Sequence, residues 1–176
     1  MLAKQWIAAR LADDSPLAEI EISSRGATGR PRIWCKGAEQ PWSLSISHTE
    51  QGVLVALGEQ ATTSVGVDLT RCEPLAESLV RLWFTSNEID WLRKISTPNM
   101  SCFLWAAKEA LYKACNDGES FDPRQVEVLP QAGCRYRGVL LEDCRLQSWS
   151  IDGHIAAMAT VMRKVPSNRQ HDFQLR

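Results

Sequence analysis

Residues 105–113 read W-A-A-K-E-A-L-Y-K and lie in a segment with the apolar spacing of an amphipathic helix. Apolar residues three and four positions apart predict a helix from about residue 101 to residue 115. They are Leu104, Ala107, Leu111 and Ala114. The polar and aromatic members of the motif share another face of this helix: Trp105, Lys108, Glu109, Tyr112 and Lys113. Taken alone, Glu109 and Lys113 are best explained as a solvated i,i+4 ion pair.

Strands are expected on both sides of a helical middle of the chain. Alternating or continuous apolar residues predict strands at 18–22, 33–35, 43–47, 53–57 and 65–69, of which 53–57 is expected to be buried on both faces. Helices are expected at 2–11 and 75–83, and the capping box Thr85-Ser-Asn-Glu88 predicts the start of another. Further strands are expected at 125–129, 139–141, 146–151 and 154–162. The turn Asp152-Gly153 joins the last two as a type I′ hairpin.

Composition excludes some classes of protein. The chain has 176 residues, and 20 Lys plus Arg against 21 Asp plus Glu give a net charge of −1. That balance argues against a protein that binds nucleic acid through bulk positive charge, although it allows a locally basic pocket. No apolar run approaches the ~20 residues that cross a bilayer, so we expect no membrane segment and a cytoplasmic location. Six cysteines without a Cys-x-x-Cys pair favour reduced thiols over disulfides or a zinc site.

Three further segments could carry chemistry. Asp68 ends a strand directly after Val-Gly-Val, where a carboxylate can meet a metal, although a strand-end cap is the simpler explanation. In Ser45-Ile-Ser47-His48, two hydroxyls lead into an imidazole, which suits a phosphate cradle or, equally, the polar side of an edge strand. Arg30 supplies one cation in the turn G-R-P. The sequence has no G-x-S-x-G elbow, glycine-rich nucleotide fingerprint or Walker motif.

Together these segments resemble, in order and spacing, the 4′-phosphopantetheinyl transferases, which move the phosphopantetheine arm of coenzyme A onto a serine of a carrier protein. The resemblance covers most of the chain. The matching motifs are G-R-P at 29–31, S-I-S-H at 45–48, V-G-V-D at 65–68, W-F-T-S-N-E at 83–88 and W-A-A-K-E-A-L-Y-K at 105–113. The last of these motifs is specific to the family, and the others support it. The interval of 41 residues from Asp68 to Glu109 is similar to that of the family.

The resemblance to the larger, surfactin-synthetase-activating type implies roles for Asp68 and for the residues of the last motif. Asp68 and Glu109 would hold a Mg²⁺ ion on the coenzyme A pyrophosphate, and oxygen ligands are those that this ion prefers. Glu109, or a water that it orients, would take the proton of the acceptor serine. Lys113 would donate to the pyrophosphate or the leaving group, with Lys108 as a second cation.

The other motifs imply contacts with coenzyme A and one departure from the family. Arg30, Ser47 and His48 match positions that contact the coenzyme A phosphates, whereas Glu88 is expected to cap its helix. Many members of this type have a second acid two residues after the first aspartate, where this chain has Thr70. Some branches also lack that acid and use water as the missing ligand.

The implied fold is α+β, a single phosphopantetheinyl transferase domain of two pseudo-symmetric α/β lobes with the active site between them. We expect a shortened N-terminal lobe at about 1–60, a fuller C-terminal lobe at about 61–165 and a loose tail at 166–176. The start of the chain resembles a point well inside the first half of the larger enzymes. We therefore expect the first lobe to lack their opening segment, whose basic residues grip coenzyme A.

Three hypotheses for the function follow. The first is Mg²⁺-dependent transfer of 4′-phosphopantetheine from coenzyme A to a serine of an apo acyl or peptidyl carrier protein, by a monomer or weak dimer that releases 3′,5′-ADP. The second, motivated by Thr70 and the short first lobe, is a non-catalytic relative that binds carrier protein or coenzyme A without transfer. The third is an interaction domain whose Lys-Glu helix is a solvated face, which predicts that Asp68 and Glu109 do not cluster.

Overall fold

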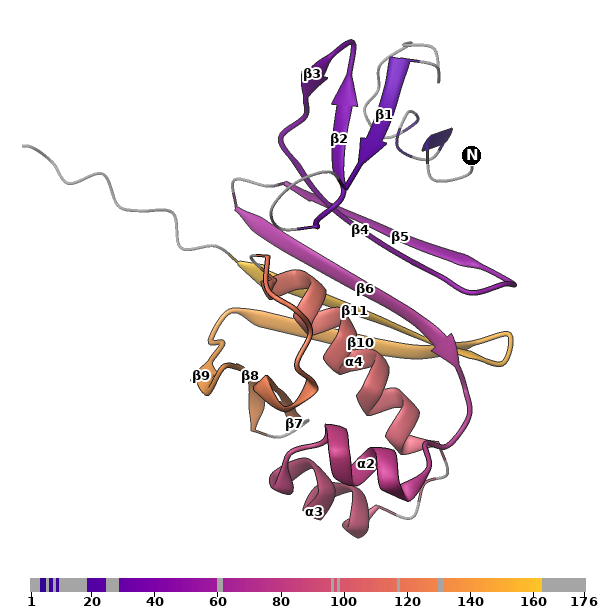
Figure 1. Cartoon of the computed structure of the whole chain (residues 1–176), viewed down its shortest axis with the longest axis vertical. Coiled ribbons are helices and arrows are strands. Elements are labelled where there is room, and N and C mark those ends of the chain that lie inside the picture. Colours follow the sequence, from indigo (N-terminus) through magenta and orange to yellow (C-terminus); the bar gives the residue numbers. More distant parts are fainter. Residues whose placement is uncertain are drawn as a thin grey trace, which may run out of the picture.

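The computed structural model describes residues 4, 5, 7, 9, 19–24, 29–59, 62–95, 97, 99–116, 118–129 and 132–162. These residues form the expected α+β fold, in which helices lie among four small antiparallel sheets (Figure 1). The helices are α2 (Glu77–Trp83), α3 (Ser86–Lys94), α4 (Met100–Cys115) and the short 3₁₀ helix η2 (Pro123–Gln125). The strands are β1 (Ile20–Ser23), β2 (Arg32–Cys35), β3 (Ala38–Glu39), β4 (Trp42–His48), β5 (Val53–Glu59), β6 (Thr63–Arg71), β7 (Val126–Leu129), β8 (Gly133–Tyr136), β9 (Val139–Leu140), β10 (Cys144–Ile151) and β11 (His154–Met162).

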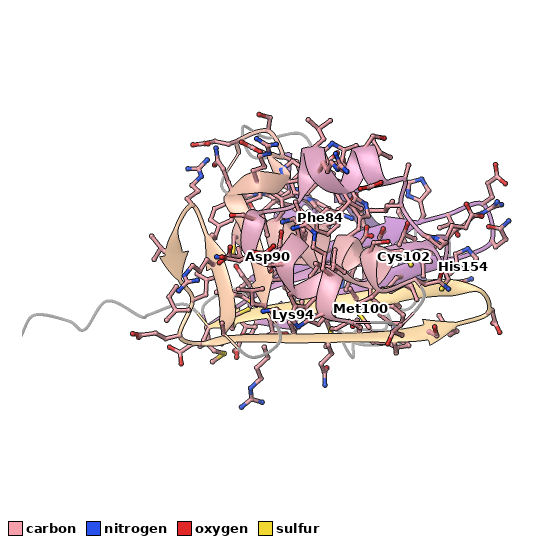
Figure 2. The ribbon with its side chains drawn as sticks, turned by 90° about the horizontal axis from the view of Figure 1, so that it is seen from below. Phe84, Asp90, Lys94, Met100, Cys102 and His154 are labelled. Atoms are coloured by element: carbon pink, nitrogen blue, oxygen red, sulfur yellow. The ribbon has the colours of Figure 1, made fainter. Side chains whose placement is uncertain are left out.

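The central sheet has the strand order β10–β11–β6, and the β4–β5 hairpin packs beside β6 (Figure 1). The β1–β2–β3 sheet lies beyond that hairpin, on the side away from the helices. The predicted turn between β10 and β11 is confirmed, because Asp152 and Gly153 have φ angles of 46° and 73°, as a type I′ turn requires. Figure 2 shows His154 at the turn end of this hairpin.

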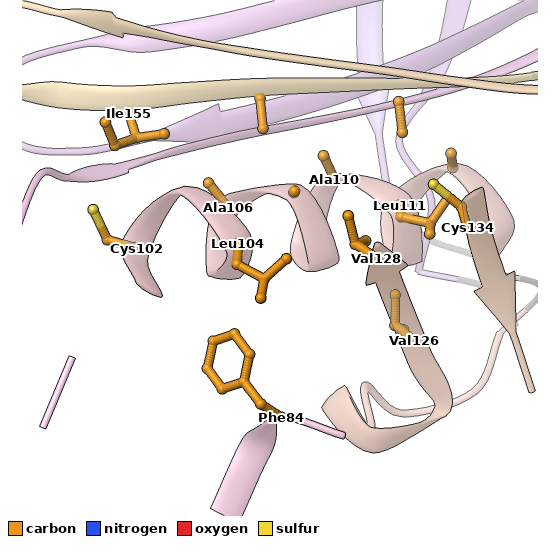
Figure 3. Close-up of a cluster of buried hydrophobic side chains, with 14 residues drawn as sticks. Phe84, Cys102, Leu104, Ala106, Ala110, Leu111, Val126, Val128, Cys134 and Ile155 are labelled. Atoms are coloured by element: carbon orange, nitrogen blue, oxygen red, sulfur yellow. The ribbon is translucent and has the colours of Figure 1, made fainter. Parts of the chain in front are cut away.

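The main core surrounds α4, which crosses the central sheet. Figure 3 shows Ala106 and Ala110 on the side of the helix that faces the sheet, and Leu104 on the side that faces Phe84. The predicted apolar stripe of this helix is buried, but the buried face is wider than the stripe. It also includes Cys102, Ala106, Lys108 and Ala110. A second cluster, with Ile20, Ile33 and Leu44 among its members, lies under the β1–β2–β3 sheet.

The predicted start of α3 is confirmed by a complete capping box. The Thr85 side chain accepts a hydrogen bond from the Glu88 backbone N–H at 3.3 Å, and the Glu88 carboxylate accepts one from the Thr85 N–H at 2.8 Å. These two bonds satisfy amide donors that the first turn of a helix would otherwise leave without a partner.

Some predicted elements differ from the structure. Strand β5 is not buried on both faces, because Ala56 is its only buried residue and Val53 is 50% exposed. Strand β8 was not predicted, and α2 begins at Glu77, later than expected. Of the helix predicted at 2–11, only residues 4, 5, 7 and 9 are described, and these are helical. The predicted tail lies outside the described residues, and the division into two lobes near residue 60 stays a prediction.

No helix in the described ranges combines the length and the hydropathy that crossing a bilayer would need. The cysteines carry thiols. Those of Cys35, Cys102 and Cys134 are buried, and those of Cys72, Cys115 and Cys144 are half-buried.

Candidate active site

Strand β6 and helix α4 approach each other so closely that only glycine fits between them. A Cβ atom on Gly66 would lie 2.0 Å from the carbonyl oxygen of Ala110 and 2.4 Å from the amide nitrogen of Ala114. Both are backbone atoms, so any larger residue would have to displace the helix. The glycine of the V-G-V-D motif thus brings the strand that carries Asp68 against the helix that carries Glu109.

Two carboxylates and one ammonium group meet at this contact. The Lys113 Nζ atom lies 2.7 Å from Asp68 Oδ1 and 3.6 Å from Glu109 Oε2. The Asp68 side chain is only 6% exposed, whereas Glu109 and Lys113 are 27% and 28% exposed and can reach a ligand. The hypothesis of a bare interaction domain predicted that Asp68 and Glu109 do not cluster, and the structure contradicts it.

Glu109 is held in an environment that disfavours its charge. Burial, followed by the neighbouring Asp68 carboxylate, raises the pKa of Glu109 to about 7, and the Lys113 ammonium acts in the opposite direction. Two carboxylates that share one lysine carry an excess negative charge, which a bound cation would neutralise. A carboxylate with a pKa near neutrality can also accept a proton at physiological pH.

Asp68 and Glu109 fit a hard divalent cation. Mg²⁺ prefers oxygen ligands and is usually held by one or two protein carboxylates, with water and substrate phosphate in its other positions. Within the described ranges, no group of three or more His, Cys, Asp or Glu side chains could hold a metal. The site therefore resembles an open two-carboxylate centre. Thr70 follows Asp68 on the same face of β6 and offers no carboxylate there.

Ser47 also belongs to this cluster. Its hydroxyl donates a hydrogen bond to Asp68 Oδ1 at 2.9 Å and lies 3.4 Å from Lys113 Nζ. It comes from β4, in which serine and apolar side chains alternate between the two faces, as predicted. The serines face β6, and Leu44 packs in the second cluster, under the β1–β2–β3 sheet. His48 follows at the exposed end of β4, and among the described residues no contact joins it to Asp68, Glu109 or Lys113.

A cleft of about 600 Å³ leads away from Lys113. Its walls come from three of the sequence motifs, with Arg30 from G-R-P, Ser45 from S-I-S-H, and Tyr112 and Lys113 from the helix motif. The Arg30 guanidinium donates to the carbonyl oxygen of Ala114 at 2.5 Å, at the C-terminal end of α4. This bond fixes a cation in the wall of the cleft, at the end of a helix where a positive charge is favourable.

Lys108 does not join this cluster, which corrects its expected role as a second cation for the pyrophosphate. Its side chain is completely buried and donates hydrogen bonds to the Glu88 carboxylate and to the Val126 carbonyl oxygen. A side chain with no exposed surface cannot bind a phosphate. The helical spacing contained the signal, because Lys108 follows Leu104 by four residues and so lies on the buried stripe of α4.

The buried pair ties three elements together. Glu88 from α3 accepts from Lys108 of α4 and from the backbone N–H of Val128 in β7, the latter at 2.8 Å. Burial raises the pKa of Glu88 and lowers that of Lys108, and in each case the charge and the hydrogen bond of the partner oppose the shift. Glu88 therefore acts as a helix cap and as a buried counter-ion for Lys108.

Aromatic rings support α4 on its outer side. Trp105 stacks on Trp83 with ring centroids 4.5 Å apart and contacts Phe121 at 5.7 Å. Tyr112 lies 4.6 Å from Phe121 and donates a hydrogen bond to the carbonyl oxygen of Glu119 at 2.5 Å. These contacts hold the helix from the side opposite the sheet, next to the turn that carries Glu109 and Lys113.

Comparison with known proteins assigns the chain to a family. The model of the 4′-phosphopantetheinyl transferase superfamily matches residues 64–159, which is more than half of the chain, and the chain belongs to this superfamily. It is 29% identical over 146 residues to L-aminoadipate-semialdehyde dehydrogenase-phosphopantetheinyl transferase from Schizosaccharomyces pombe, a match that covers 73% of this chain and 54% of that protein. The chain thus spans about half the length of this curated relative.

Among solved structures, the fold is similar in part to holo-[acyl-carrier-protein] synthase from Thermotoga maritima. The TM-score is 0.45 at 18% sequence identity, and the match covers 58% of this chain and 65% of that chain.

Proposed function

We propose that this chain transfers the 4′-phosphopantetheine group of coenzyme A to a serine of an apo acyl or peptidyl carrier protein and releases 3′,5′-ADP. The observation that carries the proposal is the meeting of Asp68, Glu109 and Lys113 at a cleft whose wall contains Arg30. Membership in the superfamily supports this chemistry. A cleft lined by cations beside two carboxylates suits a pyrophosphate that binds together with a divalent metal.

In the proposed reaction the acceptor serine oxygen forms a bond to the β-phosphorus, and the bond from that phosphorus to the oxygen of 3′,5′-ADP breaks. Glu109, or a water that it orients, accepts the serine proton, and its raised pKa suits a group that must take up a proton near neutral pH. Lys113 donates hydrogen bonds to the pyrophosphate or the leaving group. Arg30 and His48 bind the coenzyme A phosphates, with Arg30 held in the wall of the cleft.

Asp68 and Glu109 are the residues that would hold Mg²⁺. A bound Mg²⁺ ion would neutralise the charge of the pyrophosphate. The carboxylates themselves orient the cluster before any ligand arrives, because Asp68 is buried and hydrogen-bonded to Ser47.

The proposal is tested by incubating the protein with coenzyme A, Mg²⁺ and a panel of apo carrier proteins from fatty-acid, polyketide and peptide synthesis. Intact-protein mass spectrometry should show phosphopantetheine added to at least one carrier. Complete inertness toward all three classes would contradict the proposal.

The first prediction concerns Glu109→Gln, which keeps the size of the side chain but removes its charge and its ability to take a proton. We expect transfer to fall by at least about a hundredfold, the scale typical of a lost general base. The matched control is Glu77→Gln, an exposed residue of α2 that pairs with Arg81. Full activity of Glu109→Gln in the same mass-spectrometric assay would remove Glu109 from the mechanism.

A second candidate is a relative that binds coenzyme A or a carrier protein without transfer. It is favoured by Thr70, which offers no charged ligand where many relatives have an acid. Binding of coenzyme A without product formation, across the whole carrier panel, would support it. The two candidates share the cleft and differ only in whether the phosphoryl group moves.

We further propose that the protein works in the cytoplasm as a monomer or weak dimer, with coenzyme A and a carrier protein as partners and without nucleic acid or membrane. The near-zero net charge supports the absence of nucleic acid among the partners, because binding through bulk positive charge needs a basic protein. Size-exclusion chromatography with light scattering tests the oligomeric state.

A further inference from the structure

The Lys113 ammonium group contacts both carboxylates of the candidate site. It donates a hydrogen bond to Asp68 Oδ1 at 2.7 Å and forms an ion pair with Glu109 Oε2 at 3.6 Å. The contact with Glu109 is an i,i+4 pair along the helix, whereas the shorter contact reaches another element, because Asp68 lies on β6. Lys113 therefore supplies the positive charge that these two carboxylates share.

This ammonium group occupies the oxygens that a divalent cation would use. Mg²⁺ binds oxygen ligands at about 2.0–2.1 Å and would take Asp68 and Glu109 as its protein ligands. A positive charge 2.7 Å from Asp68 Oδ1 competes with such a cation for the carboxylate and also repels it. A cation shared by these two carboxylates therefore binds more favourably once the Lys113 ammonium group has moved away.

The cleft offers Lys113 a second place for its charge. The Lys113 side chain is partly exposed and lines the cleft of about 600 Å³, whose wall also contains Arg30. A lysine has a flexible four-carbon stem, so its ammonium group can turn from one anion to another. Asp68, by contrast, is buried on a strand of the central sheet. Lys113 is thus the member of the cluster that can change its partner when a pyrophosphate enters the cleft.

We propose that Lys113 is an internal counter-ion that couples the binding of coenzyme A to the binding of a divalent cation. Before coenzyme A binds, the ammonium group neutralises Asp68 and Glu109 and weakens their affinity for the metal. When the pyrophosphate binds, the ammonium group turns toward it and leaves both carboxylates to the cation.

This inference rests on the proposed function in taking Asp68 and Glu109 as the metal ligands and the cleft as the pyrophosphate site. It adds a consequence that the assignment of ligands does not contain. Because coupling between two sites is reciprocal, coenzyme A and the metal should each raise the affinity for the other by the same factor. Part of that factor should come from one lysine side chain.

The test measures Mn²⁺ binding by electron paramagnetic resonance without coenzyme A, because Mn²⁺ shares the preference of Mg²⁺ for oxygen ligands. Lys113→Met keeps most of the aliphatic stem and removes the ammonium group. It should bind Mn²⁺ at least about fivefold more tightly than the wild type, the low end of typical couplings between sites. The matched control is Lys94→Met, an exposed lysine of α3, which should stay within about twofold because distant exposed charges are screened.

Two further measurements separate the charge of Lys113 from its packing. Lys113→Arg keeps a positive charge beside the carboxylates, so its Mn²⁺ affinity should not exceed that of the wild type. In metal-free buffer, titration calorimetry should show weaker coenzyme A binding to Lys113→Met, because the pyrophosphate loses the ammonium group. A merely structural role would not give these opposite effects, since a damaged site would bind both ligands more weakly.

Thermal unfolding checks that the variants fold. Mn²⁺ should raise the Tm of Lys113→Met more than that of the wild type, because tighter binding to the folded state stabilises it more. If Lys113→Met does not fold, Lys113→Gln provides the same comparison with a polar side chain that carries no charge.

Equal or weaker Mn²⁺ binding by Lys113→Met than by the wild type would overturn the proposal. So would Mn²⁺ binding by Lys113→Arg as tight as that by Lys113→Met, since the charge would then have no effect. Failure of the proposed function looks different. In that case no carrier is modified by the wild type, while Lys113→Met still binds Mn²⁺ more tightly.

Discussion

Lys108 and Glu109 are neighbours in the chain but lie in opposite environments. The Lys108 side chain is fully buried and paired with Glu88, whereas Glu109 is 27% exposed and lies beside Lys113. A helix turns by about 100° per residue, so adjacent positions face different surroundings. The two residues therefore have different roles. Lys108 joins α4 to α3 and β7, whereas Glu109 lies beside Lys113 in the candidate site.

The second prediction follows from the burial of Lys108. Lys108→Met keeps most of the aliphatic stem but leaves Glu88 buried without its counter-ion. We expect the free energy of unfolding to fall by about 3–5 kcal/mol, the typical cost of breaking a buried pair from one side. Urea unfolding followed by Trp fluorescence measures it, with the exposed Lys94→Met in α3 as the control.

Adding Glu88→Gln to Lys108→Met should recover part of that loss, because the orphaned charge is then removed. A cost below about 1 kcal/mol for Lys108→Met, the range of exposed ion pairs, would show that the pair is not buried as described.

The third prediction concerns pH and Glu127 of β7. Burial acts to raise the pKa of Glu127, but hydrogen bonds from Thr85, Arg135 and Asn87 outweigh it and lower the pKa from its ordinary value of 4.5. A lowered folded pKa stabilises the fold above the unfolded pKa, and this contribution is lost as the pH falls through the folded value. Glu127→Gln should therefore cost about 1–2 kcal/mol near neutral pH and progressively less below about pH 4.5.

Urea unfolding of the wild type and of Glu127→Gln measures the difference in their free energies of unfolding. The measurement covers about pH 3 to 7, which includes the range in which carboxylates titrate. A difference in free energy that stays constant across this range would contradict the assigned charge on Glu127.

At the scale of elements, the contact between β6 and α4 determines where the site lies. The fourth prediction is that Gly66→Ala forces these two backbones apart, because its Cβ would lie 2.0 Å from a helix carbonyl oxygen. We expect a loss of about 3 kcal/mol or more in the free energy of unfolding, the upper range for overpacking. Transfer activity should fall as well, since the strand of Asp68 then moves away from the helix.

The control is Gly52→Ala, where the nearest atom to the added Cβ would be the flexible end of Leu69 at 3.4 Å. Wild-type stability of Gly66→Ala would show that the close approach of β6 and α4 is not required.

The sequence was informative wherever a local pattern determined the structure. The apolar repeat predicted α4, the capping box predicted the start of α3, and Asp152-Gly153 predicted the last hairpin. Strand β8 was missed because Gly133-Cys-Arg-Tyr is short and has no clear alternation. The contacts of the β4 serines with β6 could not be foreseen either. Their alternation was visible, but their partners on β6 depend on how two distant strands pack.

At the scale of the whole molecule, segments far apart in sequence form one site. Arg30 from the N-terminal part and Lys113 from α4 line the same cleft, and Asp68 from the central sheet contacts Lys113. The net charge of −1 is compatible with this arrangement, because Arg30 and Lys113 place two cations in the wall of the cleft. The resemblance predicted the meeting of Asp68 and Glu109, whereas the partners of Lys108, the Glu88 carboxylate and the Val126 carbonyl oxygen, could be found only from the three-dimensional packing.

Titration calorimetry of coenzyme A, with and without Mg²⁺, tests the central claim that Asp68 and Glu109 form a metal-dependent coenzyme A site. The protein should bind coenzyme A more tightly with Mg²⁺, and Asp68→Asn should lose this dependence. Asp90→Asn, an exposed residue of α3, should keep it. Coenzyme A binding that is indifferent to Mg²⁺ in the wild type, or equally dependent on it in Asp68→Asn, would contradict the account.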